Sequence, residues 1–169
     1  MPRSNSSLSL VLALAAAAYV VLTGLTLPPV VASHFDSSGA ANGFMSRRFY
    51  IWFMLTFVAV LPLLLVLLPN LIVRYTRVRL NLPNRDFWLA PERRQESVAF
   101  LCRHHARFGM LLTIFLCYVH WLVVRANAVA PPRLSSGMLI AGLVVLALLS
   151  VAWLGVLLGR FRQIPRKSG

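Results

Sequence analysis

The hydrophobic residues of this chain gather in four long runs, which polar connectors separate. An α-helix needs about 20 apolar residues to cross a hydrocarbon core roughly 30 Å thick, and each run is about that long. The pattern therefore predicts an all-α protein with four transmembrane helices, in a single membrane domain over residues 1–169. The predicted helices cover about residues 8–27, 49–73, 108–124 and 137–158.

The basic residues fall mainly on one side of the predicted membrane. If both termini are cytoplasmic, the inner side holds 13 basic residues, eight of them between Arg74 and Arg107. Short cytoplasmic loops carry such an excess of arginine and lysine, so both termini are predicted to be cytoplasmic. Residues 28–48 then form an outer loop, and residues 74–107 form an inner loop and the start of a helix. The outer side holds only Arg47, Arg48, Arg125 and Arg133.

The third helix is predicted to begin well before the membrane. Pro91 suits the first helical position, and Glu92 lies in the first turn, where the helix dipole favours an acid. A helix from Pro91 to about Arg125 is longer than the hydrocarbon core is thick, so its first half is expected to extend into the cytoplasm. The first run is interpreted as a retained helix rather than a secretory signal, because Pro28 and Pro29 follow it in place of a small-residue cleavage site.

The composition agrees with a membrane protein. Hydrophobic residues make up 59% of the chain, and the mean hydropathy is +0.74. The net charge of +13 lies in short connectors beside the apolar runs, where it can meet anionic lipid headgroups. The lipid bilayer is therefore the predicted partner, and nucleic acid is not.

Several functional classes are disfavoured by what the apolar runs contain. Pumps and secondary transporters usually carry ionisable groups inside the membrane, and channels need a polar lining. The sequence also shows no nucleophile–base set and no nucleotide motif, so an enzyme is the less favoured class and no cofactor is predicted. All four acidic residues (Asp36, Asp86, Glu92 and Glu96) lie outside the apolar runs.

Two side chains of the predicted outer loop suit a binding site. His34 and Asp36 place an imidazole and a carboxylate two residues apart, which suits a metal ion or a polar ligand. Two ligands fall short of a zinc site, which His120 at the outer end of the third helix would complete. In the alternative interpretation, His34 and Asp36 hydrogen-bond the backbone of a tight loop, with turns at Asp36 to Gly39 and at Asn42–Gly43.

The predicted inner loop mixes aromatic, charged and proline residues. Phe87, Trp88 and Leu89 are expected to sink into the membrane interface and to anchor the third helix there. The alternative is a docking site for a cytoplasmic partner or a phospholipid. The residues assigned to these roles are Asn84, Arg85, Asp86, Trp88, Pro91, Glu92, Arg93 and Arg94.

The outer loop carries a motif that resembles a known family. It reads Leu-Pro-x-x-Val-x-x-His-Phe-Asp-x-x-Gly-x-x-Asn-Gly-x-x-Ser-Arg, and it is similar to the signature of a bacterial membrane family catalogued as domain of unknown function 1648. The resemblance covers about Val11 to Leu61 and implies a protein of the bacterial inner membrane. The same domain begins the SdpI-type immunity proteins, which protect bacteria from a secreted toxic peptide, but the family has no assigned chemistry. The residues that carry the resemblance are His34, Phe35, Asp36, Gly39, Asn42, Gly43 and Ser46, with Arg47 in place of the usual lysine.

We therefore favour a non-enzymatic protein whose outer loop recognises an extracytoplasmic peptide, an envelope component or a partner protein. His34, Asp36 and Asn42 are the expected contact residues. One alternative is a metal-dependent membrane enzyme that uses His34, Asp36 and His120. Another is a structural subunit of a larger membrane complex. The sequence leaves the oligomeric state open.

Overall fold

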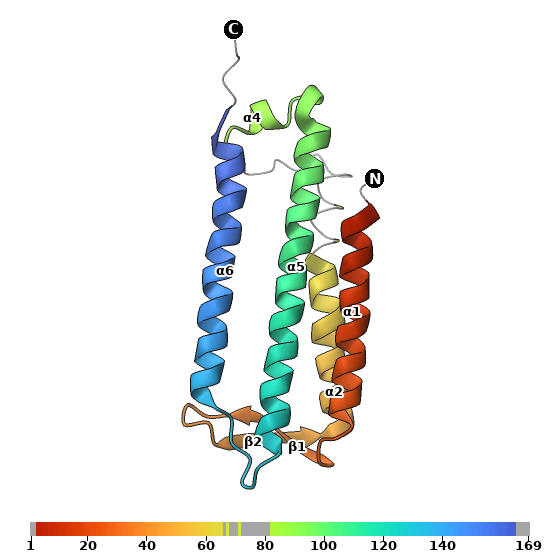
Figure 1. Ribbon diagram of the computed structural model, residues 1–169, viewed down its shortest axis with the longest axis vertical. Coiled ribbons are helices and arrows are strands. Elements are labelled where there is room, and N and C mark those ends of the chain that lie inside the picture. Colours follow the sequence, from red (N-terminus) through yellow and green to blue (C-terminus); the bar gives the residue numbers. More distant parts are fainter. Residues whose placement is uncertain (1–2, 66, 68–70, 72–81, 165–169) are drawn as a thin grey trace.

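A computed structural model describes residues 3–65, 67, 71 and 82–164. The predicted end of the second helix and most of the predicted inner loop up to residue 81 lie outside these residues. In chain order, the elements are α1 (Arg3–Gly24), β1 (Val30–Phe35), β2 (Ala41–Ser46), α2 (Arg47–Leu55), the π-helical turn η1 (Thr56–Val60), α4 (Arg85–Trp88), α5 (Pro91–Asn127) and α6 (Ser136–Arg162), as Figure 1 shows.

Four helical segments are long and apolar enough to cross a membrane, which confirms the predicted architecture. Their surfaces suit lipid, because large apolar side chains such as Leu14 and Val151 are 63% and 69% exposed. An exposed apolar surface of this extent is unfavourable in water but not in hydrocarbon. The four segments are Ser7–Gly24, Arg47–Leu65, Pro91–Asn127 and Ser136–Arg162.

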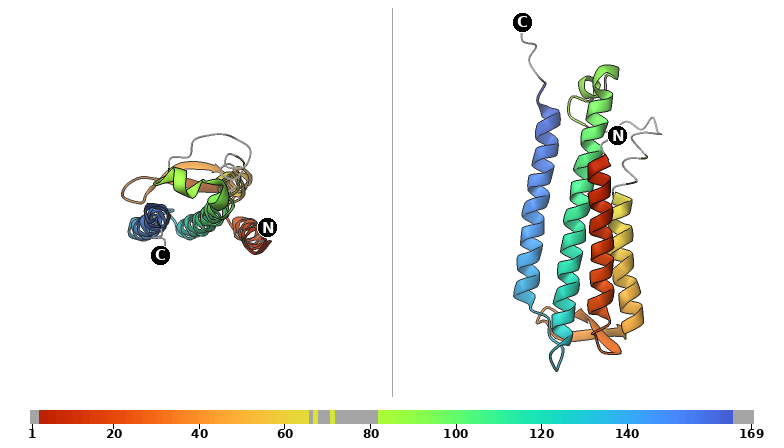
Figure 2. Two further views of the ribbon diagram at one scale, coloured as in Figure 1. Left: turned by 90° about the horizontal axis from the view of Figure 1, so that it is seen from above. Right: turned by 45° about the vertical axis from the view of Figure 1, so that its right-hand side comes forward.

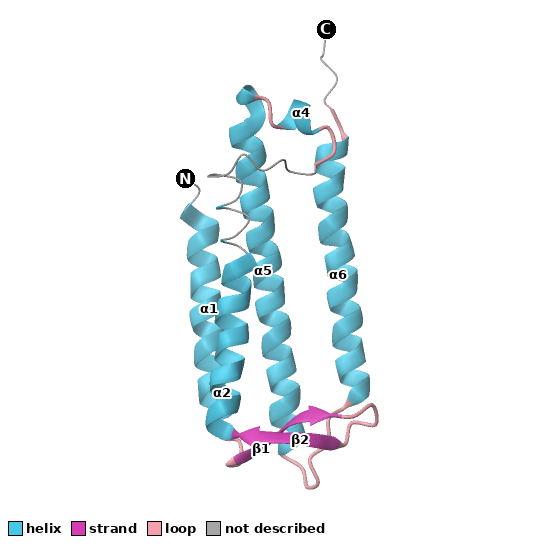
Figure 3. Ribbon diagram, turned by 180° about the vertical axis from the view of Figure 1, so that it is seen from behind, coloured by secondary structure: helices cyan, strands magenta, loops and turns pink. Residues whose placement is uncertain are grey.

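The helices are arranged around α5. In Figure 2, α6, α5 and α1 stand in a row, and α2 lies beside that row. The strands β1 and β2 cross one end of the bundle, here called the hairpin end (Figure 3). The opposite end, here called the α4 end, holds α4, the start of α1 and the end of α6. Both ends of the described chain therefore lie on one side, as four crossings require.

The helix ends follow local chemistry. α1 ends at Gly24, three residues earlier than predicted, and Leu27 turns back into the core, where it is 3% exposed. α5 begins at Pro91, as predicted from the preference of proline for the first helical position. In the second membrane segment, η1 lies just before Pro62, which has no amide hydrogen for the helical ladder. A π-helical turn is a common accommodation of such a break.

The main core lies in the half of the bundle nearest the hairpin end. It joins side chains of α1, β1, α2, η1 and α5, so the hairpin and three helices share one set of apolar contacts. Its buried members include Val20, Leu27, Val31, Tyr50, Met54, Val58 and Leu122. A smaller cluster at the α4 end is built on Trp88, Leu101 and Phe161.

At the α4 end, two side chains cap the last turn of α6. Asn84, in the left-handed conformation with φ 49°, donates from Nδ2 to the carbonyl oxygens of Phe161 at 3.1 Å and Arg162 at 2.9 Å. The Trp88 indole Nε1 also donates to the Phe161 carbonyl, at 3.0 Å. Ser97, on α5, donates from its hydroxyl to the Trp88 carbonyl at 2.7 Å. These bonds satisfy carbonyls that a helix C-terminus otherwise leaves unpaired.

This arrangement changes the role of the predicted interface anchor. Arg160 of α6 lies over the Trp88 ring at 4.5 Å and pairs with Glu96 of α5. The segment therefore fastens α6 to α5, and its role as an interface anchor stays a prediction. We call Asn84, Trp88, Ser97 and Arg160 the α6 clamp.

The remaining residues of the predicted anchor lie around the α6 clamp. Arg85 pairs with its neighbour Asp86 at 2.9 Å, but the Asp86 side chain is 91% exposed, and such surface pairs contribute only about 0–1 kcal/mol. Arg93 stacks on the Phe87 ring at 3.9 Å. Glu92 and Arg94 are exposed in the first turn of α5. A docking role for this segment stays a prediction.

We expect Trp88→Phe to weaken the α6 clamp, because it keeps a buried ring but removes the indole N–H. Loss of that hydrogen bond leaves a buried carbonyl less satisfied and should lower the free energy of unfolding by about 1 kcal/mol. Thermal unfolding in detergent would measure the loss. Trp52→Phe is the matched control, since Trp52 is 62% exposed on α2. Equal effects of the two substitutions would contradict the clamp.

Candidate functional site

The predicted outer loop is a two-stranded antiparallel hairpin. Val31 lies opposite Met45, and Ala32 lies opposite Phe44, with irregular register on both sides of His34. The prediction of a turn at Asn42–Gly43 is wrong, because both residues lie within β2. Strand pairing over so short a segment depends on the bundle beneath it, since an isolated hairpin is marginally stable in water.

The turn predicted at Asp36 to Gly39 is confirmed. One carboxylate oxygen of Asp36, Oδ1, accepts hydrogen bonds from the Ser38 amide at 2.8 Å, the Ser38 hydroxyl at 2.7 Å and the Ala40 amide at 3.0 Å. Gly39 has φ 85°, and a Cβ there would lie 2.2 Å from the Leu134 carbonyl oxygen. The Leu134 amide donates to the Gly39 carbonyl at 2.9 Å, so the turn docks on the connection between α5 and α6.

These hydrogen bonds also set the charge state of the turn. The Ser38 hydroxyl and the Ala40 amide both favour the ionised carboxylate, and they lower the pKa of Asp36 even though its side chain is fully exposed. Asp36 is therefore an anionic turn residue whose oxygen is already occupied by the hairpin itself. This geometry agrees with the alternative interpretation in which Asp36 stabilises a tight turn.

His34 is exposed at the irregular part of the hairpin. Its Nδ1 lies 3.1 Å from the Ser33 hydroxyl. A Cβ added to Gly43 would lie 2.9 Å from the Cβ of His34, so only glycine at position 43 allows the histidine side chain to pack this closely. Gly43 therefore supports the placement of His34, while the imidazole stays open to solvent.

Two residues at the end of the motif join the hairpin to the helices. The Ser46 hydroxyl caps α2 by accepting a hydrogen bond from the Phe49 amide at 3.3 Å. The Arg47 guanidinium donates from Nη1 to the carbonyl oxygens of Leu25 at 3.2 Å and Leu27 at 2.9 Å. It thereby satisfies carbonyls just beyond the end of α1. Both roles are structural.

The two long edges of the hairpin differ. On β1, the Asn127 side chain of α5 accepts from the Ala32 amide through Oδ1 at 2.9 Å and donates to the Ala32 carbonyl through Nδ2 at 2.9 Å. The amide group of Asn127 thus takes the place of a third strand. Ala32 lies opposite Phe44 on β2. In an antiparallel pair whose first member directs its amide and carbonyl away from the partner strand, the second member does the same. The amide and carbonyl of Phe44 therefore point outward along the β2 edge.

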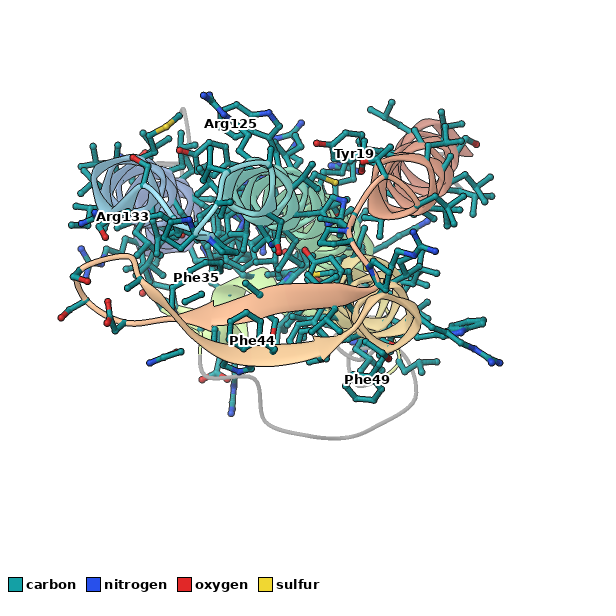
Figure 4. All side chains as sticks on the ribbon, turned by 90° about the horizontal axis from the view of Figure 1, so that it is seen from below. Tyr19, Phe35, Phe44, Phe49, Arg125 and Arg133 are labelled. Atoms are coloured by element: carbon teal, nitrogen blue, oxygen red, sulfur yellow. The ribbon has the colours of Figure 1, made fainter. Side chains whose placement is uncertain are left out.

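In the part of the chain that the structure describes, no strand other than β1 pairs with β2, and exposed side chains accompany this open β2 edge. Asn42, Phe44 and Ser46 alternate with half-buried neighbours along β2, so they share one face. Phe44 is 57% exposed. Figure 4 places Phe44 and Phe49 on the same side of the molecule, with Phe35 between the hairpin and α5. Phe35, a further motif residue, packs against the main core.

A chain of hydrogen bonds lies buried beneath the hairpin. The Thr23 hydroxyl donates to the Tyr19 carbonyl at 2.7 Å, so its oxygen must accept from Nε2 of His120 at 2.7 Å. Nδ1 of a neutral imidazole is then an acceptor, and it receives the hydroxyl hydrogen of Tyr50 at 2.9 Å. His120 is 0% exposed. This Tyr50–His120–Thr23 chain links α2, α5 and α1.

The proposed metal set is therefore not assembled. Both ring nitrogens of His120 are engaged by Tyr50 and Thr23, whereas His34 and Asp36 lie exposed on the hairpin. Among the described residues, no group of three or more His, Cys, Asp or Glu side chains is placed to hold a metal ion. The predicted metal site of His34, Asp36 and His120 is therefore wrong. The order of the helices places His120 at the same end of the bundle as His34 and Asp36, but it does not reveal that His120 is buried in the core.

Several residues that build this end of the molecule were not predicted. Thr23, Tyr50 and Asn127 make the buried contacts described above, and Leu134 receives the turn. A signal for the first three exists in the sequence, because each is a hydrogen-bonding residue near one end of an apolar run. Their partners, however, are between 70 and 97 residues away.

The fold and the hairpin end define a multi-pass membrane protein with a small extramembrane sheet. Residues 11–60 match the family model described as Domain of unknown function (DUF1648). That segment comprises most of α1, the hairpin, α2 and η1. No curated protein and no solved structure matches the chain.

The charge of Asp36 gives the hairpin a predictable response to acid. Because the folded pKa is lowered, its contribution to hairpin stability is present above the unfolded pKa of about 3.9 and is lost as the pH falls through the lower folded value. We expect the Ser38 and Ala40 amides to lose exchange protection in that acid range, as measured by NMR in micelles. Asp36→Asn keeps an oxygen acceptor and should remove the pH dependence. An unchanged pH dependence would contradict this assignment.

The buried chain predicts a specific pattern in a double-mutant cycle. His120→Phe leaves the Tyr50 hydroxyl and the Thr23 oxygen without their partner, which should lower the free energy of unfolding by about 1–3 kcal/mol. Adding Tyr50→Phe removes one stranded hydroxyl, so the double variant should lose less than the sum of the two single variants. Chemical unfolding in detergent would measure all four proteins. Strict additivity would show that Tyr50 and His120 are not coupled.

Proposed function

We propose that this is a bacterial inner-membrane protein whose hairpin end faces away from the cytoplasm. The orientation rests on the distribution of basic residues. Arg47, Arg48, Arg125 and Arg133 are at the hairpin end. The eight other basic residues that the structure describes lie toward the α4 end: Arg3, Arg85, Arg93, Arg94, Arg103, Arg107, Arg160 and Arg162. The excess belongs on the cytoplasmic side.

We further propose that the hairpin is a non-enzymatic recognition surface for an extracytoplasmic peptide segment or partner protein. The observation that carries this proposal is the contrast between the two strand edges. Asn127 covers the β1 edge, while the Phe44 backbone groups on the β2 edge point away from the sheet. Proteins usually protect a strand edge, and an open one is a template for another strand.

Strand addition is the recognition mode that fits this edge. A peptide in extended conformation would pair with the backbone of β2, and the main-chain hydrogen bonds would supply affinity. The exposed side chains of Asn42 and Phe44 would supply specificity, since they alternate to one face of the strand. Of the expected contact residues, Asn42 is on this edge, and exposed His34 is on the neighbouring strand.

The contacts of the motif residues support a narrower set of positions for the proposed recognition. Asp36, Gly39, Gly43, Ser46 and Arg47 have structural roles in the turn, the strand contact and the helix junctions. Alanine at these positions would disturb the hairpin itself. Tests of recognition therefore belong at His34, Asn42 and Phe44, whose side chains are exposed.

The experiment is photo-crosslinking in living bacteria from a photoreactive amino acid at position 42. We expect a discrete adduct that is lost in Phe44→Pro, because proline removes the outward amide hydrogen without breaking the β1–β2 ladder. Phe44→Ala separates the contribution of the ring from that of the backbone. Met45→Pro is a contrasting variant, since the Met45 amide faces β1 and its loss should unfold the hairpin.

The outcome identifies the partner class. An adduct with a peptide or another protein supports recognition by strand addition. An adduct of two copies of this chain would replace that proposal with self-association through β2. An adduct that persists unchanged in Phe44→Pro would exclude the β2 edge as the binding surface. Phe49→Ala is the control for a general effect of losing an exposed aromatic side chain at this end.

A further inference from the structure

A second feature of the hairpin end lies between the end of α5 and the start of α6. A pocket of about 160 Å³ opens there. On the same measure one water molecule needs about 10–15 Å³, so the pocket has room for a group of several polar atoms. Its lining residues are Leu122, Arg125, Ala126, Val129, Arg133, Ser135 and Met138.

The pocket carries two arginines, and no described acid lies within ion-pair distance of either. The two ion pairs among the described residues join Arg85 to Asp86 and Arg160 to Glu96, both near the α4 end. Arg125 instead stacks over the Trp121 ring at 5.0 Å, and Arg133 makes only a long contact of 3.5 Å to the Ser38 carbonyl oxygen. Both guanidinium groups thus retain donors that no described residue uses, and both residues line the pocket.

These two arginines stand out from the charge pattern of the chain. Of the four basic residues at the hairpin end, Arg47 is committed to carbonyl oxygens beyond α1, and Arg48 is outside the pocket. Arg125, in the last turn of α5, and Arg133, within the α5–α6 connection, line the same cavity although they are eight positions apart in the chain. Two unpaired guanidinium groups repel each other, and an anion between them would relieve that repulsion.

The remaining lining indicates an amphiphilic ligand. Leu122, Ala126, Val129 and Met138 supply apolar surface next to the guanidinium groups. Ser135 caps the N-terminus of α6, a 27-residue helix whose positive dipole end adds to the field. The pocket belongs to two membrane-spanning segments, at the end where each leaves the apolar part of the chain. A lining that combines apolar side chains with two arginines suits a lipid whose headgroup lies at the membrane surface.

We propose that this pocket binds the phosphate group of an anionic phospholipid through Arg125 and Arg133. Arginine suits this ligand because its planar guanidinium can donate two parallel hydrogen bonds to phosphate oxygens. The site is separate from the open β2 edge, since Figure 4 shows Arg125 on the opposite side of α5 from the hairpin. It therefore does not depend on the proposed recognition of a peptide.

The experiment compares lipid retention by the full chain, purified from vesicles that contain equal amounts of phosphatidylglycerol and phosphatidylcholine. Native mass spectrometry would count the lipids that remain bound. We expect Arg125→Gln/Arg133→Gln to lose at least about tenfold in phosphatidylglycerol retention, because two charge-assisted hydrogen bonds are removed. Phosphatidylcholine retention should change little, because its headgroup is zwitterionic.

The matched control is Arg48→Gln/Arg162→Gln, which removes the same charge from exposed arginines near both membrane boundaries. Arg125→Lys/Arg133→Lys tests the guanidinium geometry at constant charge, and it replaces the glutamine variant if that variant fails to fold.

Millimolar inorganic phosphate distinguishes two sources of the anion. Displacement of phosphatidylglycerol by phosphate would show that the phosphate group alone is recognised, whereas its persistence would show that the apolar lining contributes. Equal retention by wild type and Arg125→Gln/Arg133→Gln, or an equal loss in the matched control, would overturn the proposal.

Discussion

The hydrogen-bonded chain through His120 is the interaction on which the hairpin half of the molecule depends. It is buried among three membrane segments, where a polar group without a partner costs far more than in water. The directions of its hydrogen bonds are fixed, because Thr23 uses its only hydrogen on the Tyr19 carbonyl. Tyr50 must then donate to His120, and His120 must donate to Thr23. One arrangement of α1, α2 and α5 satisfies all three groups.

That fixed arrangement explains why a short hairpin is stable at the end of the bundle. The hairpin begins after α1 and runs directly into α2, so the two helices hold its ends. Asn127, the last residue of α5, binds the β1 edge of the hairpin, and Leu134, in the connection after α5, binds the hairpin turn. Of the family-like motif, Gly39 meets Leu134, Asp36 holds the turn, and Ser46 and Arg47 join the hairpin to the helices. The motif therefore mainly specifies how the hairpin is built, and the proposed recognition concerns the exposed positions around Phe44.

The opposite end of the molecule is held by a different interaction. α6 joins the bundle through α5, and at the α4 end the bonds from Asn84 and Trp88 close its last turn. Between the two ends, α6 and α5 approach closely at Gly142, where an added Cβ would lie 2.4 Å from the Tyr118 ring. α6 is thereby held at both ends while most of its surface remains available to lipid. The pocket at Arg125 and Arg133 lies at the hairpin end of this same α5–α6 pair.

The sequence by itself determined the four membrane helices, the start of α5 at Pro91 and the turn at Asp36, because hydrophobic length, proline geometry and turn chemistry act over a few neighbouring residues. The tertiary structure decided the rest of the site. It made Asn42–Gly43 a strand instead of a turn, withdrew His120 from the predicted metal set, and covered one edge of the hairpin with Asn127. Each of these three features depends on contacts between residues that are distant in the chain. A local sequence pattern does not show which distant residues will be in contact.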